Sequence, residues 1–152
     1  MKRALPTLLA LLLAAGLPAC RKEADPVRAT FESLAEAAND RDADAAGDLL
    51  SNAYADGEHA DRAAALLTIR RYFAAYAEIS ASLSDLEIER REDLARATFT
   101  ASFDGTPRQL GALGGLLPRT AKVRFEMNLV PEEGRWRVSW AAWSLVSGEG
   151  GP

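Results

Sequence analysis

Apolar residues recur every three or four positions from residue 26 to about residue 39, which is the spacing of one helix face. Asp25 and Pro26 form a typical helix start, because the carboxylate can accept free amide hydrogens and proline suits the first helical position. Val27 and Phe31 lead the apolar face, and the run that follows it is too polar to be buried. The pattern therefore predicts a first amphipathic helix.

Two further helices are expected before the pattern changes. Asp42 or Asp44 can cap a short helix, after which three apolar side chains face inward, namely Leu49, Leu50 and Tyr54. A third helix is expected over residues 61–79, with its arginines mostly away from the apolar stripe. The predicted stripe consists of Leu66, Ile69, Phe73 and Tyr76. Such a stripe needs an apolar surface to cover.

The second half of the chain alternates with a period of two, which is typical of strands with one buried face. Alternation runs over residues 86–91, 94–103 and 122–130, and the third of these segments gives the clearest signal. Asp104-Gly105 ends the second run, and residues 131–134 form a turn by composition. Three strands are thus expected before the last part of the chain.

The last strand is expected to start near Trp136, with Trp136 and Trp140 on the same face. Trp143 and Leu145 continue this alternation only if one extra residue is accommodated near Ala141-Ala142, and such a bulge would bend the sheet. Helices followed by an antiparallel sheet predict the α+β class, with the helices packed on one concave face.

The chain begins with the three parts of a secretory signal: a basic start, an uncharged run from Leu5 to Leu17, and a small-residue ending at Cys20. The apolar run has about 13 residues, whereas about 20 are needed to cross a bilayer, so it is expected to be cleaved. The ending Leu17-Pro18-Ala19-Cys20 resembles the lipobox of bacterial lipoproteins, although Pro18 departs from the usual Ala, Ser or Thr. The resemblance implies that Cys20 is acylated and becomes the first mature residue. An ordinary cleaved signal with an incidental cysteine is the alternative.

A lipidated Cys20 would hold the domain on a membrane, because two or three acyl chains bury enough methylene groups for stable attachment. The two basic residues that follow do not resemble the aspartate that retains enterobacterial lipoproteins at the inner membrane. The expected location is therefore the cell envelope, at the outer membrane and facing the periplasm. The expected parts are a signal peptide (residues 1–19), a short tether (20–25), the domain (26–147) and a flexible tail (148–152).

Composition fits a single domain and excludes some partners. Of the 18 basic residues, two lie in the signal, so 16 remain against 22 acidic residues and the formal net charge becomes about −6. Nucleic acid is excluded as a partner, because phosphate binding needs a basic surface. The glycines of residues 111–115 are not followed by Gly-Lys-Ser/Thr, so they do not predict a phosphate site, and no cofactor is expected.

The order of elements and the aromatic last strand resemble the nuclear transport factor 2-like superfamily, whose cone-shaped fold has a pocket between helices and sheet. Residues 134–146 are also similar to the end of the non-catalytic N-terminal domain of methicillin-resistance-type penicillin-binding proteins, through Trp136-Arg137-Val138-Ser139-Trp140 and Ser144. The likeness departs at Trp143 and at residues 109–118. It implies a spacer or interaction module, and no serine here is followed three residues later by lysine.

A pocket in such a fold would be lined by the third helix and the late strands. Tyr72 and Tyr76 stand four positions apart on one helix face, so they could present two hydroxyls to a ligand, although packing in the core is the simpler explanation. The candidate pocket or ligand residues are Tyr72, Tyr76, Phe73, Phe125, Met127 and Trp140.

Two other features are candidates for contact with a partner. Trp143 would be available for contact if it faces outward. The segment of residues 110–118 combines flexible glycines with leucines that are too apolar for full exposure, and Leu113 and Leu116 are its candidate contacts. This segment could plug the pocket, close over an apolar ligand or pair with another subunit.

His59 stands among polar residues and glycine, which predicts a solvated loop residue. Asp56, Glu58 and Asp61 stand nearby and could in principle bind a metal with it. Zinc sites, however, usually have three or four sulfur or imidazole ligands, so no metal site is predicted. The alternation of the strands leaves no carboxylate clearly inward, whereas an enzyme of the resembled superfamily would need one in its pocket.

The sequence favours a membrane-anchored, non-enzymatic module that binds a protein or a small apolar ligand in the cell envelope. The alternative is an isomerase, dehydratase or cyclase-like enzyme with a pocket carboxylate such as Asp104 or Glu126 beside Tyr72 or Tyr76. A third hypothesis is a structural homodimer, packed sheet to sheet through Trp143, Arg124 and Arg137.

Overall fold

The structure is a computed structural model that describes residues 24–108 and 117–146. Three helices come first: α1 (Pro26–Asp40), α2 (Ala43–Asp48) and α3 (Arg62–Ala75). Four strands follow: β1 (Tyr76–Arg90), β2 (Ala95–Pro107), β3 (Thr120–Glu132) and β4 (Arg135–Leu145). They form one antiparallel sheet in the order β1-β2-β3-β4. The predicted α+β class is therefore confirmed.

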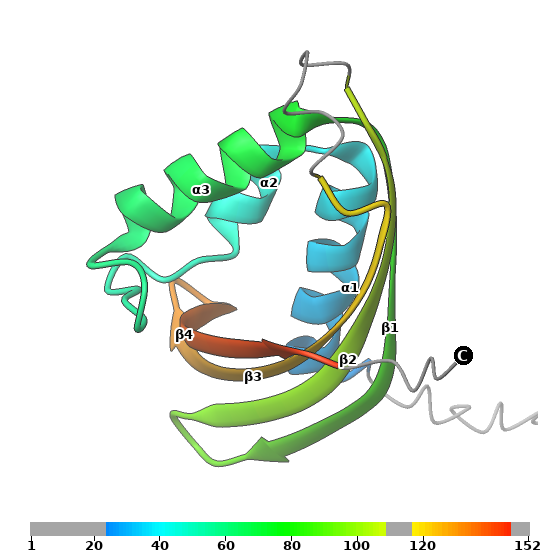
Figure 1. Ribbon diagram of the computed structural model, residues 1–152. Coiled ribbons are helices and arrows are strands. Elements are labelled where there is room, and N and C mark those ends of the chain that lie inside the picture. The colour runs from blue at the N-terminus through cyan, green and yellow to red at the C-terminus, as the bar shows by residue number, and fades with distance from the viewer. Residues whose placement is uncertain (1–23, 109–116, 147–152) are drawn as a thin grey trace, which may run out of the picture.

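The sheet curves around the helices, as Figure 1 shows. α1 lies inside the curve and packs mainly on β1, whereas α3 crosses the open side. The prediction that the helices pack on one concave face is thus confirmed. Within the residues that the structure describes, no helix combines the length and the apolar content needed to cross a bilayer.

An aspartate stands directly before each of the three helices and caps its first turn. The Asp25 Oδ1 accepts a hydrogen bond of 2.9 Å from the backbone N of Val27. Asp42, rather than Asp44, caps α2, and Asp61 caps α3 in the same way. Each cap satisfies backbone donors that the first helical turn leaves free, so these starts are set locally by the sequence.

α3 ends at Ala75, four residues before the predicted end. Tyr76 already has extended backbone angles and pairs with Pro107 of β2, so the chain passes directly from helix to strand. β1 contains two register shifts, one after Tyr76 and one at Asp85, where φ is 54°. These shifts keep the apolar side chains of the long strand on the concave face.

The core lies between α1, the middle of the sheet and the loop after α2. Val27, Phe31, Leu129 and Val138 are almost completely buried, and each such side chain contributes about 1.5–3 kcal/mol by leaving water. The three apolar residues predicted to face inward after α2 are buried, namely Leu49, Leu50 and Tyr54.

β4 contains the predicted extra residue, but at an earlier position. Leu129 pairs with Val138 and Asn128 pairs with Trp140, so the extra residue is Ser139 rather than a residue near Ala141-Ala142. Alternation alone does not fix which residue a bulge uses, because several positions restore the same pattern downstream.

The position of the bulge decides on which side of the sheet Trp140 and Trp143 lie. Trp143 pairs with Phe125 and shares its concave side, as does the buried Ala141. Trp140, next to Ala141, therefore faces the opposite, convex side of the sheet. The prediction that Trp140 lines the concave pocket is wrong, and Trp143 takes that place.

Both edges of the sheet carry additional contacts. At the β1 edge, the amide of Asn39 donates to the backbone O of Ala81 at 3.2 Å, and Asn39 Oδ1 accepts from the backbone N of Ala81 at 2.6 Å. At the β4 edge, Leu50 forms a parallel bridge with Val138. The loop after α2 is therefore attached along β4.

Candidate functional site

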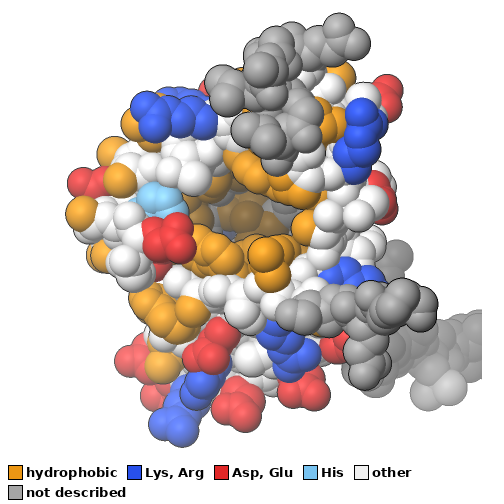
Figure 2. Space-filling view, viewed as in Figure 1, with side chains coloured by type: hydrophobic (Ala, Val, Ile, Leu, Met, Phe, Trp, Pro, Cys, Tyr) orange, Lys and Arg blue, Asp and Glu red, His pale blue; other side chains and the backbone are white. Residues whose placement is uncertain are grey.

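A hollow lined by hydrophobic side chains opens beside α3, on the open side of the curved sheet (Figure 2). Half-buried Phe125 and Met127 of β3 and Ile69 of α3 pack against the core. Trp143 of β4 remains 39% exposed on the same concave side. Half-buried and exposed apolar groups therefore surround an open space.

A row of aromatic rings connects the core with this hollow. Phe31 lies 5.2 Å from Phe99, and Phe99 stacks on Phe125 at 5.2 Å between ring centroids. Phe125 lies 6.3 Å from Trp143, which lies 6.2 Å from the imidazole of His59. Centroid separations of about 4.5–7 Å are favourable for aromatic pairs, so the row is a continuous aromatic wall.

Tyr72 and Tyr76 lie together, but they do not present two hydroxyls. Their rings are 5.2 Å apart, and Tyr76 is completely buried, because it belongs to β1. Its hydroxyl donates to the backbone O of Pro118 at 2.8 Å. Burial and the neighbouring Tyr76 raise the pKa of Tyr72, whose side chain is 41% exposed. Core packing is therefore confirmed for Tyr76, and Tyr72 alone has an accessible ring.

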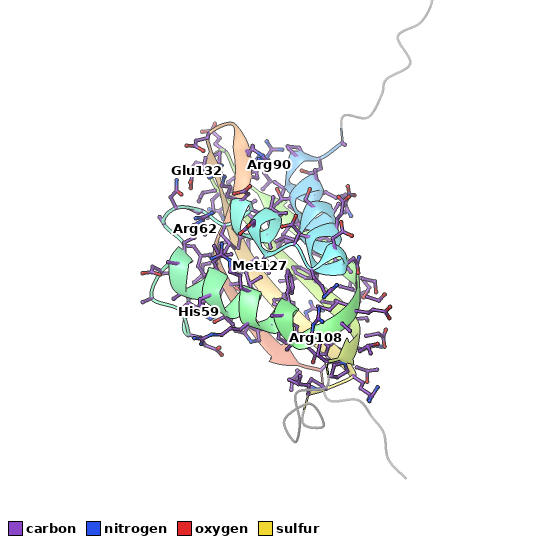
Figure 3. All side chains as sticks on the ribbon, turned by 90° about the horizontal axis from the view of Figure 1, so that it is seen from above. His59, Arg62, Arg90, Arg108, Met127 and Glu132 are labelled. Atoms are coloured by element: carbon purple, nitrogen blue, oxygen red, sulfur yellow. The ribbon has the colours of Figure 1, made fainter. Side chains whose placement is uncertain are left out.

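His59 comes from the loop between α2 and α3, and this loop is fixed to the edge of β4. Backbone hydrogen bonds join Ser51 N to Val138 O at 2.8 Å and Ala55 N to Ser139 O at 3.3 Å. The loop thereby carries His59 alongside α3, on the side away from α1 (Figure 3). The single histidine, pale blue in Figure 2, lies at the edge of the hollow.

The imidazole of His59 connects a buried carboxylate with α3. Its Nδ1 lies 2.9 Å from Oδ2 of Asp56, and its Nε2 lies 3.0 Å from the hydroxyl of Thr68. The side chain of Asp56 is 0% exposed and that of His59 is 13% exposed. Tyr54, from the core, donates its hydroxyl hydrogen to Asp56. The histidine is therefore held from both sides.

The environment of Asp56 keeps this carboxylate ionised. Burial acts to raise its pKa, but hydrogen bonds from Tyr54, from His59 and from the backbone N of Glu58 and His59 outweigh burial and lower the pKa to about 2. Burial and the bond to Asp56 raise the pKa of Tyr54, so Tyr54 remains a donor. In the neutral imidazole, Nδ1–H therefore donates to Asp56, and Nε2 accepts from Thr68.

The prediction that His59 is a solvated loop residue is wrong. Polar neighbours in the sequence do not reveal that Asp56, three residues earlier, folds back to accept from the backbone N of Glu58 and His59, each at 2.7 Å. The available signal was the Asp-x-x-His spacing that begins two residues after Tyr54, a tyrosine of the core. An Asx turn forms between neighbouring residues, so an aspartate followed by glycine, as at Asp56-Gly57, is enough to predict one.

Neither of the two strand carboxylates that the sequence offers as a pocket base, Asp104 and Glu126, is buried. Asp104 is exposed, and Glu126 pairs with Arg96 at 2.6 Å with both side chains well exposed. The buried carboxylate thus comes from a loop, where strand alternation gives no information. Within residues 24–108 and 117–146, no group of three or more His, Cys, Asp or Glu side chains is arranged to hold a metal ion.

The other predicted residues lie elsewhere. Phe73 borders a groove beside Arg41 and Arg70, between α3 and the first two helices. Arg124 pairs with Ser144 and faces away from Trp143, so these two side chains cannot belong to one sheet-to-sheet interface. The structure does not describe three further candidates, which are Cys20, Leu113 and Leu116.

A second, polar groove of about 600 Å³ lies where α1 ends, next to β1 and β2. Its lining includes charges of both signs, namely Arg41, Glu78, Asp104 and Arg119. Arg41 donates to the backbone O of Tyr76 at 2.9 Å and so joins α1 to β1. That contact gives Arg41 a structural role.

No protein-family model and no curated protein matches the chain. Solved structures do match. A protein of Novosphingobium aromaticivorans, provisionally assigned as a scytalone dehydratase, has a TM-score of 0.69 and 10% identity, over 80% of this chain and 82% of its own. A nuclear transport factor 2-like protein of Streptomyces avermitilis, provisionally assigned as a dehydratase, has a TM-score of 0.67 and 14% identity, over 81% and 95%.

A third structure is a nuclear transport factor 2-like superfamily protein from Salmonella enterica, with a TM-score of 0.65 and 13% identity, over 82% of this chain and 92% of its own. Identities this low show the fold alone. The likeness to penicillin-binding proteins stays a prediction. With three helices on a curved four-stranded antiparallel sheet, the chain has the α+β, cone-shaped nuclear transport factor 2-like fold.

Proposed function

We propose that the domain is a binding module that takes a small, largely apolar molecule into the hollow beside α3. The observation that carries the proposal is an open apolar hollow whose rim includes the exposed ring of Trp143 and the polar His59. Small-molecule sites are concave and mostly apolar, with a few polar groups that fix orientation. A ligand would cover aromatic surface that is otherwise in contact with water.

The binding of N-phenyl-1-naphthylamine, a neutral apolar dye, tests this proposal. The full-length chain should enhance the fluorescence of the dye, and Trp143→Ala should weaken binding about tenfold, as expected when roughly 1.4 kcal/mol of ring contact is lost. The matched control is Trp140→Ala, because Trp140 lies on the opposite face. Failure of the dye to bind, or equal losses in both variants, would contradict the proposal.

We propose further that acyl chains on Cys20 hold this domain on the periplasmic side of the outer membrane. Support comes from the sequence: a short apolar leader that ends in a lipobox-like Leu-Pro-Ala-Cys, without an aspartate after it. Mass spectrometry of the membrane-extracted protein should find acyl chains on Cys20, and Cys20→Ala should release the protein from the membrane. A mature chain that begins elsewhere would exclude the anchor.

A second candidate function is proton-transfer catalysis, as in a dehydratase or isomerase. The ionised, buried Asp56 orients His59, and the imidazole lies at the edge of an apolar hollow. A positioned histidine is the usual general base in enzymes, and its reach to the substrate decides whether it acts. Two of the structural relatives carry provisional dehydratase assignments, which is consistent with such chemistry on this fold.

The probe for this candidate is 5-nitrobenzisoxazole. Removal of its ring C–H proton by a base breaks the N–O bond and releases a coloured phenolate, so no other reactant is needed. A catalytic His59 should convert it at least tenfold faster than His59→Gln does, since general bases contribute about 10²-fold or more. Glu58→Gln, exposed in the same loop, is the control. Equal rates in the wild type and His59→Gln would exclude the candidate.

A further inference from the structure

We infer that the ligand of the hollow is a neutral aromatic compound with a hydroxyl group, and that this hydroxyl donates a hydrogen bond to Nε2 of His59 in place of Thr68. The inference rests on the proposed binding function and names the chemical class of the ligand. Four features of the site carry it: the acceptor role of His59, the exchangeable position of Thr68, the aromatic rim and the negative charge beside it.

The polar group at the rim is a hydrogen-bond acceptor. Because the ionised Asp56 takes the Nδ1–H of His59, the neutral ring has only an unshared pair left at Nε2. The hydroxyl of Thr68 donates to this atom at 3.0 Å. A ligand that takes over this position must therefore bring its own donor, and a methyl group or a carbonyl oxygen would leave Nε2 unsatisfied.

Thr68 can give up this hydrogen bond at little cost. It lies on α3 and is exposed to solvent, unlike the buried Asp56 on the other side of the ring. A threonine hydroxyl in a helix can rotate to the carbonyl oxygen of the preceding turn, so its donor finds another acceptor. The bond between His59 and Thr68 is thus the exchangeable one, whereas the bond to Asp56 stays.

Aromatic rings form the surface next to this acceptor. The imidazole of His59 and the indole of Trp143 have centroids 6.2 Å apart and are tilted by 32°, and Phe125 continues the wall 6.3 Å beyond Trp143. Trp143 is 39% exposed, so part of its ring is available to a ligand. Flat rings gain offset or edge contacts with such a surface, which saturated rings of the same size do not.

The charge beside the acceptor favours a neutral ligand. Asp56 carries a buried negative charge, and its Oδ2 lies 2.9 Å from Nδ1 of His59. Asp61 adds an exposed carboxylate at the end of the same loop. A carboxylate or phenolate at Nε2 would meet an unshared electron pair and like charges, whereas a neutral hydroxyl meets a complementary acceptor.

Calorimetric titration of the full-length chain with four probes tests the inference. The probes are 2-naphthol, 2-methylnaphthalene, 2-naphthoate and decahydro-2-naphthol, which separate the hydroxyl, the charge and the aromatic ring. We expect 2-naphthol to bind about fivefold more tightly than 2-methylnaphthalene, as a typical net hydrogen bond implies. The anionic 2-naphthoate and the saturated alcohol should both bind more weakly than 2-naphthol.

Two variants connect this preference to the named atoms. In His59→Phe, the ratio of the 2-naphthol and 2-methylnaphthalene affinities should fall to about one, while 2-methylnaphthalene still binds. Thr68→Val removes the internal donor but keeps the shape, so the same ratio should rise above the wild-type value. Glu58→Gln is the control and should leave the ratio unchanged. Thr68→Val keeps the test decisive if His59→Phe does not fold.

The outcomes distinguish failure of the ligand class from failure of the binding function. If 2-methylnaphthalene or 2-naphthoate binds as tightly as 2-naphthol, or if Thr68→Val lowers the ratio, the hydroxyl-aromatic ligand class is excluded while binding in the hollow stands. If none of the four probes binds, the proposed binding function fails together with the inference.

Discussion

Asp56→Asn should remove a stabilising charge from the loop between α2 and α3. The pKa of Asp56 falls from its ordinary value of 3.8 to about 2, because four hydrogen bonds to the carboxylate outweigh burial. At 1.36 kcal/mol for each pKa unit, this difference corresponds to about 2 kcal/mol of folding free energy at neutral pH. The side chain is 0% exposed, but Asp56 lies in a surface loop, so this value is the largest that the charge can contribute. Asparagine fits the same space but is neutral at every pH.

The assay is urea unfolding of the full-length chain, followed by far-ultraviolet circular dichroism. At pH 7 the midpoint for Asp56→Asn should lie about 1 M below that of the wild type, for a dependence of about 1–3 kcal/mol per molar urea. The sign follows from the lowered pKa: the contribution is complete above about pH 3.8 and is lost as pH falls towards 2. About half of the difference should therefore be gone at pH 3.

Asp93→Asn provides the control, because Asp93 is exposed in the turn between β1 and β2. Its midpoint should follow the wild type at both pH values. If the difference between the wild type and Asp56→Asn is absent at pH 7, or stays constant down to pH 3, Asp56 does not have a lowered pKa in the folded state, since only such a carboxylate produces this dependence.

Three further substitutions test packing and capping. Gly105→Ala should lower the melting temperature by several degrees, because the added Cβ would lie 2.6 Å from the ring of Phe103 and 2.7 Å from that of Tyr76. Gly57→Ala is the control and should leave the melting temperature unchanged, because no atom lies within 4 Å of the added Cβ. Asn39→Ala should cost about 1 kcal/mol and speed amide exchange at Ala81, and an unchanged exchange rate would contradict the edge contact. Asp25→Ala should cost about 1 kcal/mol in urea unfolding, whereas an unchanged midpoint would exclude the cap.

The fold was predictable where local chemistry decides it. The caps at Asp25 and Asp61 are formed by side chains next to the backbone groups they satisfy, so the helix starts follow from the sequence. The end of α3 could not be predicted from the sequence, because the pairing of Tyr76 with β2 overrides the helical pattern, which continues to Ile79. Leu94, expected to begin the inward alternation of the second strand, is 40% exposed, because the strand begins at the buried Ala95.

The candidate site was less predictable, because it depends on contacts between distant segments. One residue, Ser139, decides which tryptophan faces the hollow, and alternation is equally satisfied by other bulge positions. His59 gains its environment from the attachment of Ala55 to β4 and from Thr68 on α3. The sequence around the histidine does not predict such long-range contacts. A strand-based search for inward carboxylates therefore missed Asp56.

The side-chain amide of Asn39 imitates the backbone of a neighbouring strand. It offers Ala81 one donor and one acceptor, which are the two groups that a strand of another copy would use to join β1. At the other edge, the Leu50 bridge occupies β4 at Val138. Edge-to-edge growth of the sheet into aggregates is thus opposed at both of its edges.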